Sequence, residues 1–325
     1  MADVLCLRPK TDFTQVGVTP PDILDIAYMG PDDAAMPAAL KAGAALVIPA
    51  VGPKLPLKLF AGSTIRLVQV TGAGVDRVDT IGLKELGIAV ANVPGGSSNA
   101  VAEYVLSCAT VLLRRFTQST PAIRNGRYDA FRSQLLRDNV EGLQGLLVGI
   151  IGMGIIGTAV AHRFKQAGAR IAFFDPALGG AHPDAALEAQ ALGLEELLAQ
   201  ADLVTLHVPL LPSTEKLIDA DRLALMKPGA VLIQASRGGV VDEAALAAAL
   251  ESGRLGGAAV DVYSREPPTE DNPLLRLSDA AAQRTILTPH IAGVTRQSWA
   301  SLFRRAWENV MRVVVDNQPP DYVVQ

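Results

Sequence analysis

Cysteine, histidine and long apolar runs are scarce in this sequence of 325 residues. The two cysteines, Cys6 and Cys108, lie far apart in apolar segments, so we expect buried thiols in a reducing compartment, and neither a disulfide nor a metal site. No segment approaches the ~18 apolar residues of a membrane span, and the start, MADVLCLRPK, lacks the pattern of a signal peptide. The net charge of −4, without a block of Lys or Arg, gives no indication of a nucleic-acid partner. These absences predict a globular cytoplasmic protein that binds neither nucleic acid nor a membrane.

Hydrophobic residues make up 49% of the sequence and charged residues 19%, which is ample material for a core. A chain of 325 residues is too long for one ordinary core and suits two domains. In the first part of the chain, short β-rich runs recur at 4–7, 23–29, 45–51, 66–72 and 88–94. Helix-like segments between several of these runs predict parallel βαβ units.

The alternation stops after this first part of the chain. Residues 100–118 predict one long helix, and the polar segment 119–142 predicts an irregular arm or loop. A second series of β-rich runs follows at 146–152, 170–175, 202–208, 230–235, 257–263 and 285–288. Six strands with helices between them predict a second doubly wound sheet.

The end of the chain, residues 296–315, has apolar residues at helical spacing, so we expect a helix that packs back on the first domain. The predicted fold class is therefore α/β, with two doubly wound parallel-sheet domains and an interdomain cleft. The expected boundaries are 1–99 plus 296–325 for one domain and 100–295 for the other.

The segment VGIIGMGIIG, residues 148–157, has the spacing of a phosphate-binding turn. Gly152 permits the tight turn, Gly154 lets a pyrophosphate approach the backbone, and Gly157 lets the helix pack closely on the strand. The next strand ends in Asp175, whose carboxylate would accept hydrogen bonds from the adenosine ribose and would repel a 2′-phosphate. The pattern alone is weak, but an apolar strand before it and an amphipathic helix after it favour a Rossmann domain that binds NAD.

Three later strands are each followed by a residue that can take part in catalysis. Arg237 follows 230–235, Glu266 lies a few residues after 257–263, and His290 follows 285–288. Each of them, taken alone, is as well explained as an ordinary surface residue. Together at one edge of a parallel sheet, they could bind an anionic substrate and handle a proton, because a carboxylate beside His290 would stabilise the imidazolium form.

The chain resembles the D-isomer-specific 2-hydroxyacid dehydrogenases, a family that includes glyoxylate/hydroxypyruvate reductases and phosphoglycerate dehydrogenases. The matching segments, in order, are 70–79, 99–106, 148–157, 206–218, 226–243, 257–268 and 287–295. The resemblance implies a flavodoxin-like substrate domain, a Rossmann NAD-binding domain and a homodimer built largely on the latter. It also implies interconversion of a small 2-oxo acid and its D-2-hydroxy acid by hydride transfer.

The resemblance further implies roles for individual residues. Arg237 is expected to bind and polarise the substrate, Glu266 to pair with the catalytic His290, and the amides of Ala73 and Gly74 to bind the substrate carboxylate. The expected cofactor contacts are Gly152, Gly154, Ile155, Ile156, Gly157, Asp175, Val208, Ala235, Ser236, Asp261 and His290, with Asp261 orienting the nicotinamide carboxamide.

Some positions depart from the family pattern. Gln234 replaces the usual Asn, and Pro49 lies where phosphoglycerate-directed members tend to carry an arginine. The second departure argues against a large phosphorylated substrate, without choosing among glyoxylate, hydroxypyruvate, lactate or a bulkier acid. Two alternatives stay open: an NAD-sensing binding protein or corepressor without metabolic turnover, and a formate dehydrogenase, whose branch carries extended N-terminal sequence.

Overall fold

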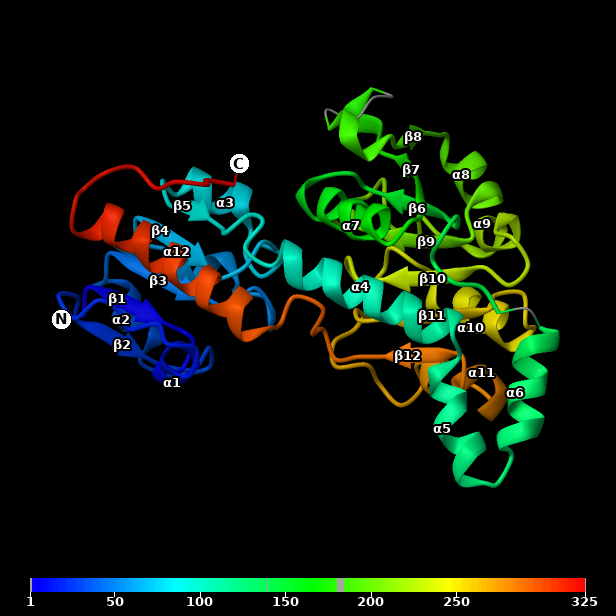
Figure 1. Cartoon of the computed structure of the whole chain (residues 1–325). Coiled ribbons are helices and arrows are strands. Elements are labelled where there is room, and N and C mark those ends of the chain that lie inside the picture. Colours follow the sequence, from blue (N-terminus) through cyan, green and yellow to red (C-terminus); the bar gives the residue numbers. More distant parts are fainter. Residues whose placement is uncertain (1, 139, 180–183, 325) are drawn as a thin grey trace. The chain divides into compact units, whose positions relative to one another are not determined.

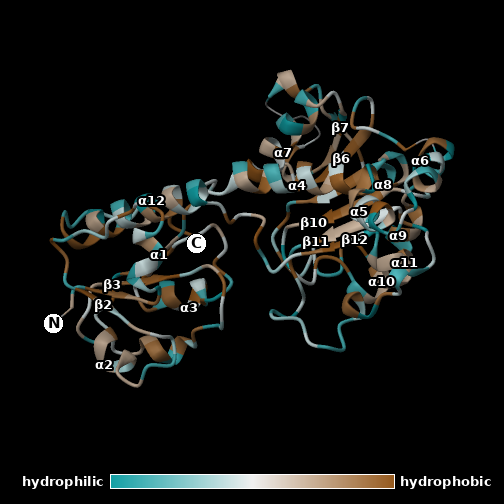
Figure 2. Cartoon of the chain, turned by 60° about the horizontal axis from the view of Figure 1, so that its bottom comes forward, coloured by the Kyte–Doolittle hydropathy of each residue, from teal (hydrophilic) through white to brown (hydrophobic). Residues whose placement is uncertain are grey.

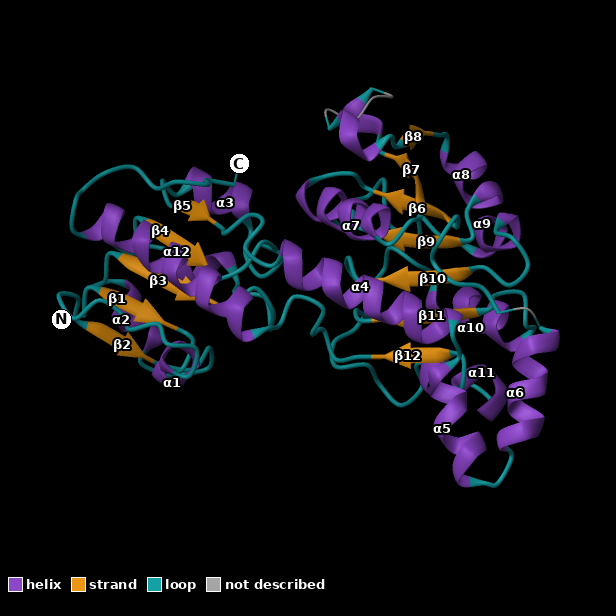
Figure 3. Ribbon diagram, viewed as in Figure 1, coloured by secondary structure: helices purple, strands orange, loops and turns teal. Residues whose placement is uncertain are grey.

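The computed structural model describes residues 2–138, 140–179 and 184–324. The chain divides into two compact units: unit 1 comprises Met1–Ser97 and Val294–Gln325, and unit 2 comprises Ser98–Gly293 (Figure 1). The sequence predicted boundaries after residue 99 and before residue 296, and both lie slightly further along the chain than the boundaries in the structure. Each unit is built on one parallel sheet, so the predicted class of two parallel-sheet α/β domains is confirmed (Figure 3).

Unit 1 contains a five-stranded sheet with the order β2-β1-β3-β4-β5. Its strands are β1 (Val4–Cys6), β2 (Ile26–Tyr28), β3 (Ala45–Ile48), β4 (Leu67–Val70) and β5 (Ala89–Ala91). Its helices are α1 (Lys10–Thr14), α2 (Met36–Leu40), α3 (Thr80–Glu85) and α12 (Arg296–Val314). This strand order is the flavodoxin-like arrangement, in which the carboxyl ends of the parallel strands share one edge.

Helix α12 packs on the sheet of unit 1, as its apolar spacing predicts. Its inner face buries Phe303, Trp307 and Val310 in the same core as Phe13 of α1. The helix begins at a capping box, in which the side chains of Thr295 and Ser298 bind each other's backbone amides. Figure 2 shows both apolar and polar residues along α12, as expected for a helix with one buried face.

Unit 2 contains a seven-stranded sheet with the order β12-β11-β10-β9-β6-β7-β8. Its strands are β6 (Leu147–Ile151), β7 (Arg170–Phe174), β8 (Gln190–Ala191), β9 (Leu203–Leu206), β10 (Val231–Gln234), β11 (Gly257–Val260) and β12 (Thr285–Leu287). Its helices include α4 (Ser98–Leu113), α7 (Ile155–Gln166), α8 (Leu194–Gln200), α9 (Ala220–Leu225), α10 (Glu243–Glu251) and α11 (Asp279–Ala282). The sequence predicts six of these strands and misses β8, because a two-residue edge strand leaves no hydrophobic pattern.

The region after α4 differs from the prediction. The helix ends at Leu113 rather than 118, and Arg115 then takes a left-handed conformation with φ of 52°. The segment predicted as an irregular arm contains two further helices, α5 (Phe116–Arg124) and α6 (Tyr128–Arg137). The prediction of one helix over 100–118 and a loop over 119–142 was wrong, because α6 buries no residue within the chain and so lacks a recognisable core-facing pattern.

Both cysteines are buried free thiols, and burial raises the pKa of Cys6 to about 12. Within the described part of the chain, no helix is both long enough and apolar enough to cross a lipid bilayer.

Candidate active site

The glycine-rich turn joins β6 to α7 in unit 2. Gly152 has a φ of 90°, and a Cβ atom on it would lie 2.6 Å from the carbonyl oxygen of His207. A Cβ atom on Gly157 would lie 2.1 Å from the carbonyl oxygen of Gly152, so helix and turn approach too closely for a side chain. Gly154, the N-cap of α7, is exposed and has nothing within 4 Å of its Cβ position. The open space therefore lies over the positive end of α7, where a phosphate group is stabilised.

Asp175 follows β7 and faces the same turn. One carboxylate oxygen accepts a 2.8 Å hydrogen bond from the Met153 amide, and the other accepts a 2.9 Å bond from the Ala177 amide. Gly152, Gly154, Asp175 and Val208 all line a hollow of about 730 Å³ in unit 2. The turn, the helix end and the acid thus have the geometry that an adenine dinucleotide requires.

The two isoleucines after Gly154 lie differently. Ile155 is exposed at the start of α7, whereas Ile156 packs partly against the core of the unit. Only Ile155 therefore presents most of its side chain to solvent near the turn.

The turn after β10 carries Ala235, Ser236 and Arg237. Gln234 spans this turn, because its side chain donates to the Arg237 carbonyl oxygen at 2.9 Å and accepts from the Ser236 hydroxyl at 2.8 Å. A Cβ atom on Gly238 would lie 1.8 Å from the carbonyl oxygen of Tyr263. The turn after β10 and the chain after β11 are therefore in direct backbone contact, and this contact brings Arg237 close to Glu266.

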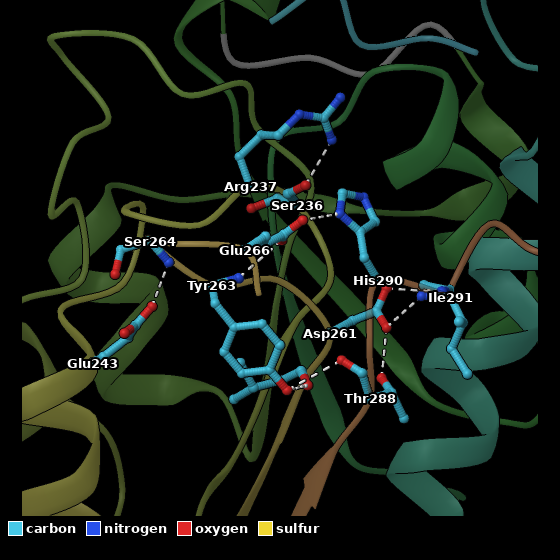
Figure 4. Close-up of polar contacts among 12 residues, drawn as sticks. Ser236, Arg237, Glu243, Asp261, Tyr263, Ser264, Glu266, Thr288, His290 and Ile291 are labelled. Atoms are coloured by element: carbon cyan, nitrogen blue, oxygen red, sulfur yellow. Dashed lines mark hydrogen bonds and ion pairs between the residues drawn. The ribbon is translucent and has the colours of Figure 1, made fainter. Parts of the chain in front are cut away.

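His290 and Glu266 form a pair at the carboxyl edge of the sheet (Figure 4). His290 Nδ1 lies 2.8 Å from Glu266 Oε2, and Glu266 Oε1 accepts a 3.1 Å hydrogen bond from the Tyr263 amide. Burial disfavours the charged carboxylate, but the bonds from His290 and Tyr263 and the positive charge of Arg237 outweigh it and hold the pKa of Glu266 below its usual value. Since an ionised carboxylate only accepts hydrogen bonds, Nδ1 of His290 carries the proton of this bond.

Asp261 holds the backbone that carries His290. It is 1% exposed, and its carboxylate accepts hydrogen bonds from the Ile291 and Ala292 amides at 2.8 Å and from the Thr288 hydroxyl at 2.5 Å. His290 itself has a φ of 56°, a left-handed conformation that surrounding contacts must support. The carboxylate of Asp261 is thus engaged with the turn of His290, and the nicotinamide contact implied by the family stays a prediction.

Tyr104 and Thr288 belong to this network, although sequence reasoning missed them. The Tyr104 hydroxyl on α4 lies 2.7 Å from the Thr288 hydroxyl, and the Tyr263 hydroxyl donates to the Thr288 carbonyl oxygen at 3.1 Å. Tyr104 and Thr288 are 184 positions apart, and no sequence motif links them.

The other described histidines are poorly placed to exchange a proton beside Glu266. Burial lowers the pKa of His207 to about 3, so its ring is neutral near pH 7. His162 lies on α7 and contacts Asp184 at 2.9 Å, outside the group around Glu266. His182 lies outside the described residues.

Ala73 and Gly74 lie in unit 1, in the turn after β4. The Ala73 carbonyl oxygen accepts a 2.6 Å hydrogen bond from the Asn92 side chain, which fixes the turn. Among the described residues, neither the Ala73 amide nor the Gly74 amide donates to a backbone carbonyl group. The two N–H groups are therefore available to a carboxylate.

Comparison with known proteins identifies the family. The model of the NAD binding domain of the D-isomer specific 2-hydroxyacid dehydrogenases matches residues 106–292, more than half of the chain. The chain therefore belongs to the D-isomer specific 2-hydroxyacid dehydrogenases, a family of NAD-dependent oxidoreductases.

Individual relatives differ in their named substrates. The (S)-sulfolactate dehydrogenase of Chromohalobacter salexigens is 39% identical over 252 residues, which cover 77% of this chain and 78% of that protein. The D-3-phosphoglycerate dehydrogenase of Archaeoglobus fulgidus is 34% identical over 238 residues, which cover 73% of this chain but only 43% of that longer protein. The crystal structure of D-lactate dehydrogenase from Aquifex aeolicus with NAD and lactic acid has a TM-score of 0.82 and 25% identity, covering 97% of this chain and 95% of that one.

Alanine substitutions in the glycine-rich turn test its role. We expect Gly154→Ala to fold normally, because its Cβ position is open, but to bind NADH roughly tenfold more weakly, a loss of about 1.4 kcal/mol. Gly157→Ala is expected to lower the melting temperature, because its Cβ atom would collide with the Gly152 carbonyl oxygen. Fluorescence titration with NADH and thermal denaturation measure both effects. Unchanged NADH affinity in Gly154→Ala would count against phosphate binding at this turn.

Proposed function

We propose that this protein reduces a small 2-oxo acid to its D-2-hydroxy acid with NADH, and catalyses the reverse reaction with NAD. The observation that carries the proposal is the 2.8 Å contact between His290 and Glu266. The positive charge of Arg237 acts on Glu266, and all three residues belong to the unit whose glycine-rich turn fits the dinucleotide. A proton carrier, a fixed cation and a hydride donor are the elements that carbonyl reduction needs.

His290 would act through its second ring nitrogen. Because Nδ1 is held by Glu266, Nε2 is the atom left to exchange a proton with the substrate. In reduction, NADH bound at the glycine-rich turn would supply a hydride, which forms the new C–H bond at C2 of the 2-oxo acid. The protonated His290 would give its Nε2 proton to the carbonyl oxygen, which thereby becomes the hydroxyl group of the product.

Arg237 would bind and polarise the substrate. Its charge acts on Glu266, so it lies near the reacting groups, and it would stabilise the negative charge that develops on the carbonyl oxygen. The Ala73 and Gly74 amides of unit 1 are proposed to bind the substrate carboxylate together with Arg237. The glutamate would keep the imidazolium form stable until the proton is transferred.

The proposed substrate is a small 2-oxo acid without a phosphate group. Pro49 follows β3 where phosphoglycerate-directed relatives tend to carry an arginine, which removes one anion-binding group. The relatives named above act on sulfolactate, phosphoglycerate and lactate, so their names do not select one acid.

The role of His290 can be tested by substitution. We expect His290→Ala to lower turnover by about 10²–10⁴, the range for a positioned acid–base group, while NADH affinity is retained. The assay follows NADH absorbance at 340 nm with a panel of small 2-oxo acids. His162→Ala is a matched control, because His162 also contacts a carboxylate but lies on the surface of α7. Near-normal turnover of His290→Ala would refute the assignment.

Asp175 is proposed to select NAD over NADP. We expect Asp175→Ala to lower the ratio of kcat/KM for NADH to that for NADPH, because the carboxylate that repels a 2′-phosphate is removed. The substitution also removes the bonds from the Met153 and Ala177 amides. Asp184→Ala, which removes a bond from the Ala186 amide similar to that from Ala177, serves as the control for the second of these losses. An unchanged ratio in Asp175→Ala would argue against contact with the ribose.

We propose that the chain forms a homodimer through α5 and α6. Helix α6 buries no residue within the chain, and Ile123 and Leu136 are 55% and 66% exposed. A short helix without packing is only marginally stable in water, so a partner surface would account for it.

Light scattering after gel filtration tests this dimer. We expect the double variant Ile123→Lys, Leu136→Lys to be a monomer, because two charges would lie in the apolar contact. Ile23→Lys is the control, since Ile23 is equally apolar and 70% exposed but lies in unit 1. A monomeric wild-type protein would exclude the proposed dimer.

A further inference from the structure

The loop that carries Glu266 has little packing of its own. This loop, residues 264–272, follows β11, and Ser264–Pro267 are exposed residues, although the side chain of Glu266 is only 25% exposed. Exposed loops with few buried contacts open at low cost in free energy. Contacts with neighbouring elements would therefore help the bond from the Tyr263 amide to keep Glu266 at hydrogen-bond distance from His290.

Glu243, the first residue of α10, binds both ends of this loop. Its Oε1 accepts a 2.6 Å hydrogen bond from the Ser264 amide, and its Oε2 accepts a 2.7 Å bond from the Asn272 side-chain amide. Figure 4 shows the first of these bonds to the left of Glu266 and His290. Asn272 is buried, and its own side-chain oxygen accepts a bond from the Leu274 amide, so this end of the loop is fixed as well.

The helix does not need Glu243 for its own stability at this end. Asp242 is the N-cap of α10, and its side chain accepts hydrogen bonds from the Ala244 and Ala245 amides. Both carboxylate oxygens of Glu243 are thus used for the loop rather than for capping the helix.

We propose that Glu243 is a positioning residue for the catalytic pair: by holding Ser264 and Asn272, it keeps Glu266 against His290. Ser264, whose amide binds Glu243, is the neighbour of Tyr263, whose amide binds Glu266. Glu243 therefore restrains the carboxylate of Glu266 through these two residues. The proposal rests on the function proposed above, since it assigns a role in the same proton transfer.

Other charged groups face the pair and remain unchanged in the test. Arg237 acts on Glu266 from the turn after β10, and Asp261 lies beneath the turn of His290. Burial, and then the charges of Asp261, Glu266 and Glu243, raise the pKa of Tyr263 to about 12, so Tyr263 stays neutral in the working range.

The test compares Glu243→Gln with Glu251→Gln. In a glutamine one of the two acceptor oxygens is replaced by an NH2 group, which only donates, so the bonds that Oε1 and Oε2 of Glu243 accept from Ser264 and Asn272 cannot both be kept. Glu251 is a close match at the other end of α10, because it accepts bonds from the Ser278 amide at 2.6 Å and the Ser278 hydroxyl at 2.7 Å, in a loop without catalytic residues. Glu266→Gln gives the effect of losing the pair itself.

Three quantities are measured for each variant: kcat as a function of pH, NADH affinity and melting temperature. The kcat measurements use the 2-oxo acid of the panel that the wild type reduces fastest. Glu266→Gln replaces the negative charge at Nδ1 of His290 with a neutral amide, so it should shift the alkaline fall of kcat to lower pH. We expect Glu243→Gln to shift the alkaline fall of kcat in the same direction by a smaller amount. It should also lower kcat about threefold to tenfold, which is part of the rate gain that acid–base catalysis provides. NADH affinity should be retained, and Glu251→Gln should match the wild type.

The outcomes separate this inference from the function on which it rests. If Glu266→Gln shifts the profile and Glu243→Gln does not, or if Glu251→Gln shifts it equally, the positioning role is overturned. If Glu266→Gln leaves the profile unchanged, the proposed proton transfer fails, and this inference fails with it. If Glu243→Gln does not fold, Asn272→Asp is tested in its place. The aspartate keeps the oxygen that accepts from the Leu274 amide, but its second oxygen replaces the NH2 group that binds Glu243, so the two carboxylates repel each other. The same shift is expected, and its absence would overturn the role.

Discussion

The hydrogen bond between Nδ1 of His290 and the carboxylate of Glu266 is the interaction on which the chemistry proposed for unit 2 depends. It sets which ring nitrogen carries the fixed proton and, in the proposed reaction, leaves the other nitrogen for the substrate. The two residues follow neighbouring parallel strands, β11 and β12, so the sheet brings their loops to one edge. The close backbone contact at Gly238 adds the turn of Arg237 to the same place.

The edge combines strands with exposed loops, and buried or half-buried polar groups connect the two. Asp261 holds the left-handed turn of His290 through backbone amides, and Gln234 spans the turn before Arg237. Glu243 does the same for the exposed loop of Glu266. Polar groups that are satisfied in this way restrict side chains that would otherwise sample many conformations, and an acid–base pair needs that restriction.

Much of this architecture can be predicted from the sequence, for a physical reason. Strands of a parallel sheet that are buried on both faces, such as β6, β9 and β10, read as continuous apolar runs. Helices α5 and α6 could not be found in this way, since α6 has no face buried within the chain. At the site, family motifs single out Arg237, Glu266 and His290 as candidates. The hydrogen bonds of Glu243, and that between Tyr104 and Thr288, join residues that share no motif, so they are seen only in the structure.

A crystal structure of the protein with NADH and oxamate, an unreactive analogue of a 2-oxo acid, would show whether His290 faces the substrate carbonyl. We expect Nε2 of His290 to lie about 2.6–3.2 Å from the oxygen of oxamate that stands for the substrate carbonyl. Nδ1 should remain bound to Glu266, and Arg237 should contact the same ligand. An imidazole that faces away from the ligand, or another acid–base side chain in its place at that oxygen, would rule out proton transfer by His290.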